Sequence, residues 1–567
     1  MPLRALLLAA TLLFPTLASA QGVAGPYLAA RVAGSENDYE AAASEYARLL
    51  ARPNVPAAVI ENAVIVFGAL GRFEEAAEAA GRMTLAGAPS RFGAGVQAVA
   101  ALDAGDYAAA RRILEDGQGV GGALLDGLLA GWIAAAEGDR ERAEAAFEAL
   151  AETDGFAALA QYHRALMLAE AGDLEAADDI LSGREEGVLN VTARGVEAHA
   201  QVLMGLGRRD DALDLLAQAG ELADDPGLAA LRARIEAGEA VGFELIRTPR
   251  DGLAEAFYTI GAILAGDTPP TFVLLNAQAA VTLRPDHVDA LVLVASLFDE
   301  QGQHDLANDV LQRVPADDPA FDGAEVARAE VLLASGREDA AVEVLQGITR
   351  ANPGDLAAWI ALGDTLRRVE RFGLASDAYT RAIDLRDEIE PQDWFLFYAR
   401  GITYERQGRF DLAEPDFRRA LELNPGQPLV LNYLGYSLVE ERIKLDEALD
   451  MIERAVAARP DDGYITDSLG WVYYRLGRFE EAVAPMERAA ELLPLDPLVN
   501  DHLGDVYWAV GREREARFQW RRALSLEPEP EEVDRIRRKL EVGLDVVLAE
   551  EGAGAGGDDD AGDDAAE

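Results

Sequence analysis

Cysteine is absent from this chain of 567 residues, and lysine occurs only twice, at Lys444 and Lys539. The lack of cysteine excludes disulfides, thiolate metal ligands and a lipidated cysteine. Neither lysine lies in a Gly-rich phosphate-binding loop, which excludes that kind of nucleotide site. Basic side chains of any kind are scarce, because 51 lysines and arginines stand against 101 aspartates and glutamates, a net charge of −50.

This charge argues against two classes of partner. Nucleic acids and anionic membrane surfaces are bound by clustered Lys and Arg side chains, which this sequence does not offer. Two interpretations of the charge stay open. It attracts a basic protein partner, or it only keeps a long alanine-rich chain soluble.

Motifs for catalysis are also missing. The five histidines are scattered without metal-ligand spacing, and neither HExxH nor GxSxG occurs. Gly117, Gly119 and Gly122 match the spacing of a dinucleotide-binding loop, but they follow a predicted helix where that loop requires a strand. We therefore expect no enzyme, with no catalytic residue, no cofactor and no metal site.

The first twenty residues are typical of a secretory signal peptide. Arg4 precedes an apolar run from Ala5 to Leu17, and the small residues 18–20 suit cleavage between Ala20 and Gln21. The alternative is a membrane anchor, although the run is shorter than the roughly 20 residues that cross a bilayer. No other segment is apolar enough to span a membrane, so we expect a soluble, periplasmic mature protein.

The same sequence pattern is repeated three times between Leu429 and Leu526. Leu-Gly pairs recur at 434–435, 469–470 and 503–504, alanines at 448, 482 and 516, and prolines at 460, 494 and 528, a period of 34 to 35 residues. Small residues are needed where two helices cross closely. Gly477 and Gly511 suit the left-handed end of a first helix, and each proline ends a second helix. This is the pattern of the tetratricopeptide repeat, a 34-residue helix-turn-helix unit.

The rest of the chain follows the same rhythm less clearly. Tyr39, Phe73 and Tyr107 stand 34 residues apart, whereas the stretch from Phe243 to Pro249 has no helical period. The prediction is an all-α solenoid, a superhelix of about 14 repeats with a degenerate N-terminal half. Its parts are a signal peptide (1–20), a degenerate solenoid (21–239), an irregular join (240–287), a C-terminal solenoid (288–528), a capping helix (529–548) and a disordered acidic tail (549–567). A hinge within residues 240–270 is the alternative for the join.

In such a stack the first helices line a concave groove, where partner segments bind. Five of the six tryptophans and nine of the fifteen tyrosines lie beyond residue 350. Aromatic rings among carboxylates suit a partner that carries Arg or Lys. The predicted protein-binding groove consists of Tyr398, Asn432, Tyr436, Asp467, Trp471, Tyr474, Asp501, Asp505 and Trp508. The alternative is that most of these rings pack between neighbouring helices.

The amino-acid sequence of these repeats resembles a proteobacterial family of exported tetratricopeptide proteins. The segments that carry the resemblance are NYLGYSL, DSLGWVYYRLG and HLGDVYWAVGREREARFQWRRAL. The best-described type of this family is a lipoprotein adaptor of the periplasmic carboxyl-terminal processing protease, and the resemblance covers about Gly252 to Leu548. It implies a non-enzymatic periplasmic scaffold that brings the protease and its cell-wall hydrolase substrates together. No residue roles carry over, because the shared motif is structural, and Ala20-Gln21 stands where the type has its lipidated cysteine. A structural part of an envelope-assembly or polysaccharide-export complex is the alternative function.

Overall fold

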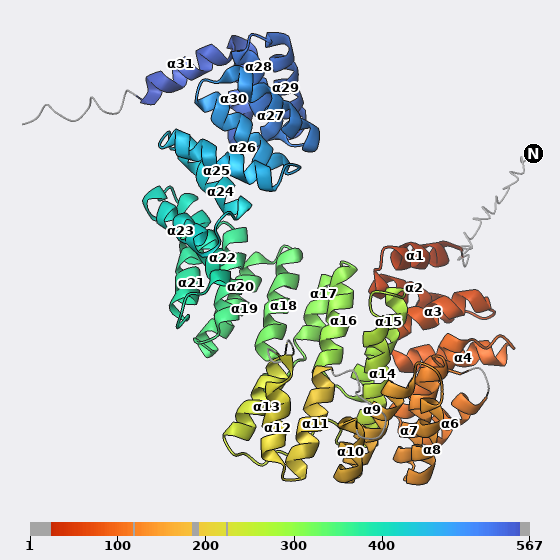
Figure 1. Ribbon diagram of the computed structural model, residues 1–567. Coiled ribbons are helices and arrows are strands. Elements are labelled where there is room, and N and C mark those ends of the chain that lie inside the picture. Colours follow the sequence, from red (N-terminus) through yellow and green to blue (C-terminus); the bar gives the residue numbers. More distant parts are fainter. Residues whose placement is uncertain (1–23, 117–118, 184–191, 221, 223–224, 556–567) are drawn as a thin grey trace, which may run out of the picture. The chain divides into compact units, whose positions relative to one another are not determined.

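The computed structural model describes residues 24–116, 119–183, 192–220, 222 and 225–555. These residues form helices and turns without a strand (Figure 1), which confirms the predicted all-α repeat fold. The predicted signal peptide, Gly117 and residues 556–567 of the predicted tail lie outside the described part. Within that part no helix is both long and apolar enough to cross a membrane.

The chain divides into two compact units, residues Met1–Val344 and Leu345–Glu567, called unit 1 and unit 2 below. The helices of unit 1 are α1 Ala24–Ser35, α2 Tyr39–Leu50, α3 Ala57–Ala69, α4 Phe73–Leu85, α5 Arg91–Asp103, α6 Tyr107–Glu115, α7 Ala123–Ala136, α8 Arg140–Ala151, α9 Ala157–Glu170, α10 Leu174–Leu181, α11 Ala193–Gly205, α12 Arg209–Ala217, α13 Pro226–Glu236, α14 Pro249–Leu264, α15 Pro270–Leu283, α16 Val288–Glu300, α17 His304–Leu311 and α18 Phe321–Ala334. α19 Glu338–Ala351 spans the boundary.

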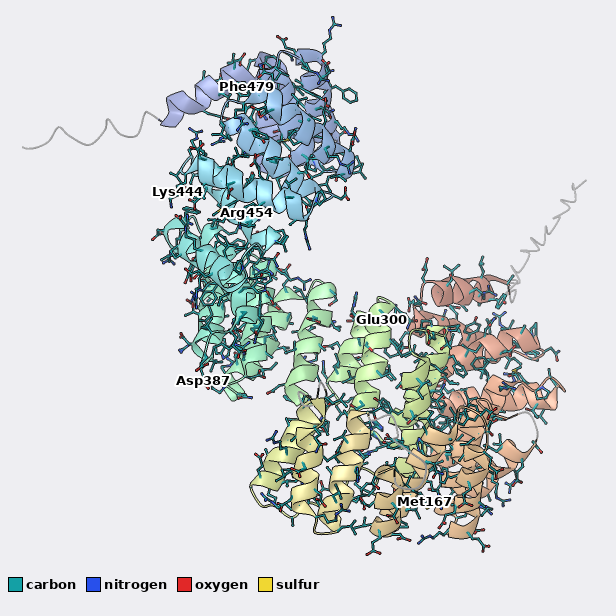
Figure 2. All side chains as sticks on the ribbon, in the orientation of Figure 1. Met167, Glu300, Asp387, Lys444, Arg454 and Phe479 are labelled. Carbon is teal, nitrogen blue, oxygen red and sulfur yellow. The ribbon has the colours of Figure 1, made fainter. Side chains whose placement is uncertain are left out.

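Unit 2 continues with the same kind of hairpin. Its helices are α20 Leu356–Arg368, α21 Phe372–Asp384, α22 Trp394–Glu405, α23 Phe410–Leu423, α24 Pro428–Glu440, α25 Leu445–Ala458, α26 Gly463–Arg475, α27 Phe479–Leu492, α28 Pro497–Ala509, α29 Glu513–Ser525, α30 Pro530–Val542 and α31 Leu544–Ala555. Side chains fill the space between the helices of each unit, and Phe479 marks the start of α27 in Figure 2.

Local sequence explains where each hairpin helix begins and ends. Asp462 caps α26 by accepting a hydrogen bond from the Ile465 amide at 3.2 Å, and Asp496 caps α28 in the same way. Gly477 ends α26 with φ +73°, and the Arg478 amide then donates to the Tyr473 carbonyl at 2.9 Å. The predicted helix-ending glycine is therefore present in the expected left-handed conformation.

The glycine of each Leu-Gly pair, within the first helix, lies at the crossing of the two helices. A Cβ atom added to Gly435, Gly470 or Gly504 would stand 2.7, 2.5 or 2.4 Å from a side chain of the second helix. Those side chains are Ile452, Met486 and Trp520, and all are buried. The second helix thus fits against its partner only because the first helix has no side chain at that point.

Residues 240–287, the predicted irregular join, contain two complete helices. Only the stretch before α14 is irregular, and α14 then begins at a capping box made by Thr248 and Asp251. α14 packs on α7 and α9, and α15 packs on α3 and α5, so this hairpin lies along the first helices of the N-terminal repeats (Figure 1). Gln278 donates to the Ala69 carbonyl at 3.2 Å, and Gly252 lies directly against the Trp132 ring.

The end of unit 2 also differs from the prediction. Instead of one capping helix to Leu548 and a tail from residue 549, α30 and α31 form two helices, and α31 extends to Ala555. Gly543 separates them with φ +89°, and a Cβ there would stand 2.6 Å from the Trp508 ring. The apolar pattern runs on across Gly543, so the sequence alone suggested a single helix.

Candidate functional site

The candidate site is the face of unit 2 formed by the first helices α22, α24, α26 and α28, called the first-helix face below. α24 contacts α26, α26 contacts α28, and the Tyr398 ring of α22 packs on the Tyr433 ring of α24. All nine predicted groove residues lie on these helices. Two positions recur on it at repeat spacing, and each has its own chemistry.

The outermost position is apolar and exposed. Leu429, Tyr464 and Leu498 occupy the first turns of α24, α26 and α28, and their exposed fractions are 37%, 60% and 45%. Single exposed apolar residues are common on protein surfaces. Three at the same position of successive repeats form a row, which sequence reasoning missed because it took only the positions expected to face the groove.

The next position, one turn further along, carries an oxygen acceptor. Asn432, Asp467 and Asp501 occupy it, and each has a buried Oδ1 without a hydrogen-bond partner. Asp467 is 6% exposed and Asp501 is 2% exposed. A buried acceptor that lacks a donor costs free energy, so this row favours binding of hydrogen-bond donors.

Asp467 belongs to a stacked aromatic cluster. It accepts a hydrogen bond from His502 Nδ1 at 2.9 Å, and the His502 ring stacks on Trp471 with 4.0 Å between centroids. The Tyr474 ring also stacks on Trp471, with 4.9 Å between centroids, and Trp471 Nε1 donates to Glu440 at 2.7 Å. Burial alone would lower the pKa of His502, but the charge of Asp467 and its hydrogen bond outweigh burial and raise it.

The carboxylates of Asp501 and Asp505 both bind a lysine of the same chain. Lys539 of α30 is fully buried, and its Nζ lies 2.6 Å from Asp501 and 2.8 Å from both oxygens of Asp505. Arg535 approaches both carboxylates at 3.7 Å. Burial and the charge of Asp505 raise the pKa of Asp501 to about 6, against the opposing effect of Lys539. These two carboxylates are therefore not open to a partner while α30 is in place.

Trp508 is covered in a similar way. Its Nε1 donates to Asp545 of α31 at 3.2 Å, and its ring lies 5.3 Å from Trp520. The helices α30 and α31 thus occupy the last part of the first-helix face. On α24 and α26 the face exposes Leu429 and Tyr464, whereas Asp467 and Trp471 are buried.

The remaining predicted residues are half-buried. Tyr398 packs among Trp394, Phe417 and Tyr433 with centroid distances of 5.9 to 6.2 Å. Burial and the charges of Glu440 and Asp467 raise the pKa of Tyr436, which keeps its phenol neutral. For Tyr398 the structure matches the alternative interpretation of a ring packed between helices.

Sequence reasoning missed Lys539 and His502 as members of this site. Lys539 lies 34 residues beyond Asp505, and the only available signal was a lysine on the apolar face of a predicted cap in a chain with two lysines. Among the described residues, no group of three or more histidine and carboxylate side chains is arranged to hold a metal ion.

Comparison with known families identifies the repeats. Tetratricopeptide repeat models match residues 394–427, residues 300–366, and residues 128–180 and 441–497. The TPR repeat-containing protein PA4667 of Pseudomonas aeruginosa is 41% identical over 54 residues, which is 10% of this chain and 9% of that protein. The chain therefore matches less than a tenth of the length of that curated relative.

Comparison with solved structures gives matches of low TM-score and low identity. The Cut9–Hcn1 hetero-tetramer of the APC/C has a TM-score of 0.38 and 15% identity, covering 93% of this chain and 97% of that chain. A tetratricopeptide repeat protein of Parabacteroides merdae has a TM-score of 0.37 and 16% identity, covering 43% of this chain and 95% of that chain. YrrB has a TM-score of 0.27 and 19% identity, covering 35% of this chain and 99% of that chain.

Proposed function

We propose that this chain, which contains tetratricopeptide repeats in both of its units, is a non-enzymatic scaffold that binds other proteins through the first-helix face of unit 2. We further propose that it is exported to the periplasm, as the sequence of residues 1–20 suggests. Its partner would be a carboxyl-terminal processing protease or the cell-wall hydrolases that such a protease cleaves. This last step rests on the sequence resemblance alone.

The observation that carries the proposal is the burial of the Lys539 ammonium group between two aspartates of α28. Two aspartates on α28 enclose this ammonium group completely. One repeat earlier, Asp467 occupies the same position with one oxygen unpartnered, and Asn432 follows two repeats earlier. The same position of α24 and α26 thus carries, below the surface, the kind of acceptor that already binds a basic side chain on α28, and a partner cation would have to insert as Lys539 does.

The rows of the face describe the partner segment. Exposed apolar side chains run beside the buried acceptors, so a matching segment presents apolar residues next to Lys or Arg. Such a segment, extended or helical, would lie across successive first helices. The net charge of −50 would attract a basic segment before contact.

The test uses purified mature protein and purified carboxyl-terminal processing protease from the same organism. We expect a complex by isothermal titration calorimetry. Replacing Leu429, Tyr464 and Leu498 together by Ser should weaken it at least about tenfold, because hydrophobic anchors dominate interfaces. The matched control replaces the exposed Leu374 and Phe518 of the second helices α21 and α29 by Ser and should leave binding unchanged.

Equal binding by both sets of variants would remove the first-helix face as the site. A protein that binds no protease but co-purifies with a membrane-bound export complex would instead support the alternative function. Recovery of the protein from the cytoplasm with an intact N-terminus would overturn the periplasmic assignment.

A further inference from the structure

Unit 1 contains a cavity of about 930 Å³ that plays no part in the proposed protein-binding face. It is lined by α9, α11, α13, α14 and the turn before α16. Its volume is typical of sites that bind small molecules or a few side chains. Tyr162 and Tyr258 contribute aromatic surface to its wall, and Leu231 and Ile263 contribute aliphatic surface.

A fixed polar network forms one side of this cavity. Glu255 accepts two hydrogen bonds from Arg194, at 2.9 and 2.6 Å, and Asp289 accepts a third at 2.5 Å. His287 Nδ1 accepts from the Ala290 amide, so its proton is on Nε2, which lies 3.2 Å from Glu255. Arg194 is therefore neutralised by the chain itself and is not free to bind an anion.

Glu197 on α11 differs, because it lines the cavity without a cation of its own. Gln201 accepts from the amides of Glu244 and Leu245, which turns its NH₂ group toward Glu197 Oε1 at 2.9 Å. Within the described residues, no donor is placed on Oε2 of Glu197. Burial raises the pKa of Glu197, although Arg194 opposes this, so a ligand cation near Oε2 would relieve an unfavourable state.

The remaining charges of the lining also favour a cation. Seven carboxylates and three arginines line the cavity. Arg234 is paired with Glu244 at 3.1 Å, and Arg284 with Asp286 at 3.4 Å. None of the three guanidinium groups is left without a carboxylate partner.

Three helices begin at the wall, which by itself would suit an anion. Their first turns, however, are already capped by this chain. Thr192 caps α11, Asp225 caps α13 and His287 caps α16, each by accepting a backbone N–H. One backbone N–H of each first turn is thus occupied, and the carboxylate of Asp225 disfavours an anion at the start of α13.

We propose that this cavity is a binding site for an organic cation, an amine or guanidinium group on an apolar body. Glu197 Oε2 would accept its N–H, and its apolar body would lie against the aromatic and aliphatic side chains of the wall. The cation would come either from a free polyamine or from a Lys or Arg side chain of a peptide.

The experiment measures binding to full-length mature protein by isothermal titration calorimetry at about 0.15 M salt, where weak surface attraction is screened. The probes are spermidine, diacetylspermidine, a short Gly-Arg-Gly peptide amide with an acetylated N-terminus, and inorganic phosphate. Glu197→Gln keeps the shape of the side chain and its bond to Gln201. Glu236→Gln, an exposed α13 carboxylate outside the cavity, makes the same change in charge.

We expect spermidine or the peptide to bind, with affinity at least tenfold lower for Glu197→Gln and unchanged for Glu236→Gln. Preference for spermidine assigns a polyamine source, and preference for the peptide assigns a protein source. Ala230→Phe, which adds a ring at the cavity wall, should abolish both. The proposal is overturned if neither cation binds, if both Gln variants weaken binding equally, or if diacetylspermidine or phosphate binds better. None of these outcomes depends on the protease complex, so the two proposals fail separately.

Discussion

Glycine sets how closely the two helices of a hairpin approach. At Gly504 a Cβ would stand 2.4 Å from Trp520 Nε1, and Trp520 is fully buried with Nε1 bonded to Asp505 at 2.8 Å. We expect Gly504→Ala to lower the free energy of unfolding by about 1–3 kcal/mol, because the indole must move within a packed core. Urea unfolding followed by circular dichroism measures it.

Gly347 supplies the control. It lies inside α19 with nothing within 4 Å of an added Cβ. Gly347→Ala should therefore raise stability by up to about 1 kcal/mol through helix propensity alone. If both variants shift the midpoint in the same direction, close approach at Gly504 does not control packing.

His502 is expected to give the unit a pH-dependent stability. Its pKa is raised in the folded state, so this contribution is complete below the unfolded value of about 6.5 and is lost as pH rises through the folded value. The difference in unfolding free energy between wild type and His502→Gln should thus shrink as the pH rises above about 6.5. A constant difference would mean that His502 is neutral and that only its stacking on Trp471 matters.

For individual residues, the sequence predicted which small residues lie between packed helices, but it did not predict which charged side chains pair with one another. The small residues recur with the repeat, so their role at the helix crossing follows from periodicity. Lys539 and Glu255 do not recur, and their partners lie 38 and 61 residues away at Asp501 and Arg194. No pattern within one repeat can reveal such pairs.

At the scale of the helices, α30 is held on the first-helix face by its buried Lys539. Lys539→Met leaves Asp501 and Asp505 buried with Arg535 as their remaining cation. We expect a loss of about 3–5 kcal/mol, because an uncompensated buried charge is expensive. Hydrogen exchange should show faster opening of α30 and α31 than of α24.

Lys444→Met is the matched variant, since it removes the other lysine. Lys444 lies at the surface before α25 and pairs with Glu414 there (Figure 2). Exposed pairs contribute about 0–1 kcal/mol, so stability should hardly change. Equal losses in the two variants would contradict a special role for the buried lysine.

Helix boundaries were predictable where a glycine or proline recurs, and less so where it does not. Gly543 follows a helical apolar pattern that resumes in α31, so its left-handed backbone was hidden. The helices α14 and α15 were harder still, because their apolar faces are covered by helices far earlier in the chain. The hydrogen-bonded pairs Tyr162–Glu255 and Ala69–Gln278 are 93 and 209 residues apart. The apolar periodicity of a helix indicates which of its faces is buried, but it does not indicate which other helix packs on that face.

Taken as a whole, the molecule repels itself electrostatically. With a net charge of −50, increasing salt from about 0.01 M to about 1 M should raise the melting temperature, as the screening length falls from about 30 Å to about 3 Å. The same increase should slow association with a basic partner. A melting temperature that falls with salt would show that surface ion pairs outweigh the repulsion.

The α14–α15 hairpin bears on how unit 1 reaches its native state. In an ordinary repeat array each module contacts only its neighbours, and folding can spread from any point. Here the N-terminal repeats pack on α14 and α15, which are synthesised much later. Completing their packing therefore costs the entropy of closing a long loop of chain. Unit 1 should therefore melt as a single block, whereas a ladder of repeats would lose its ends first.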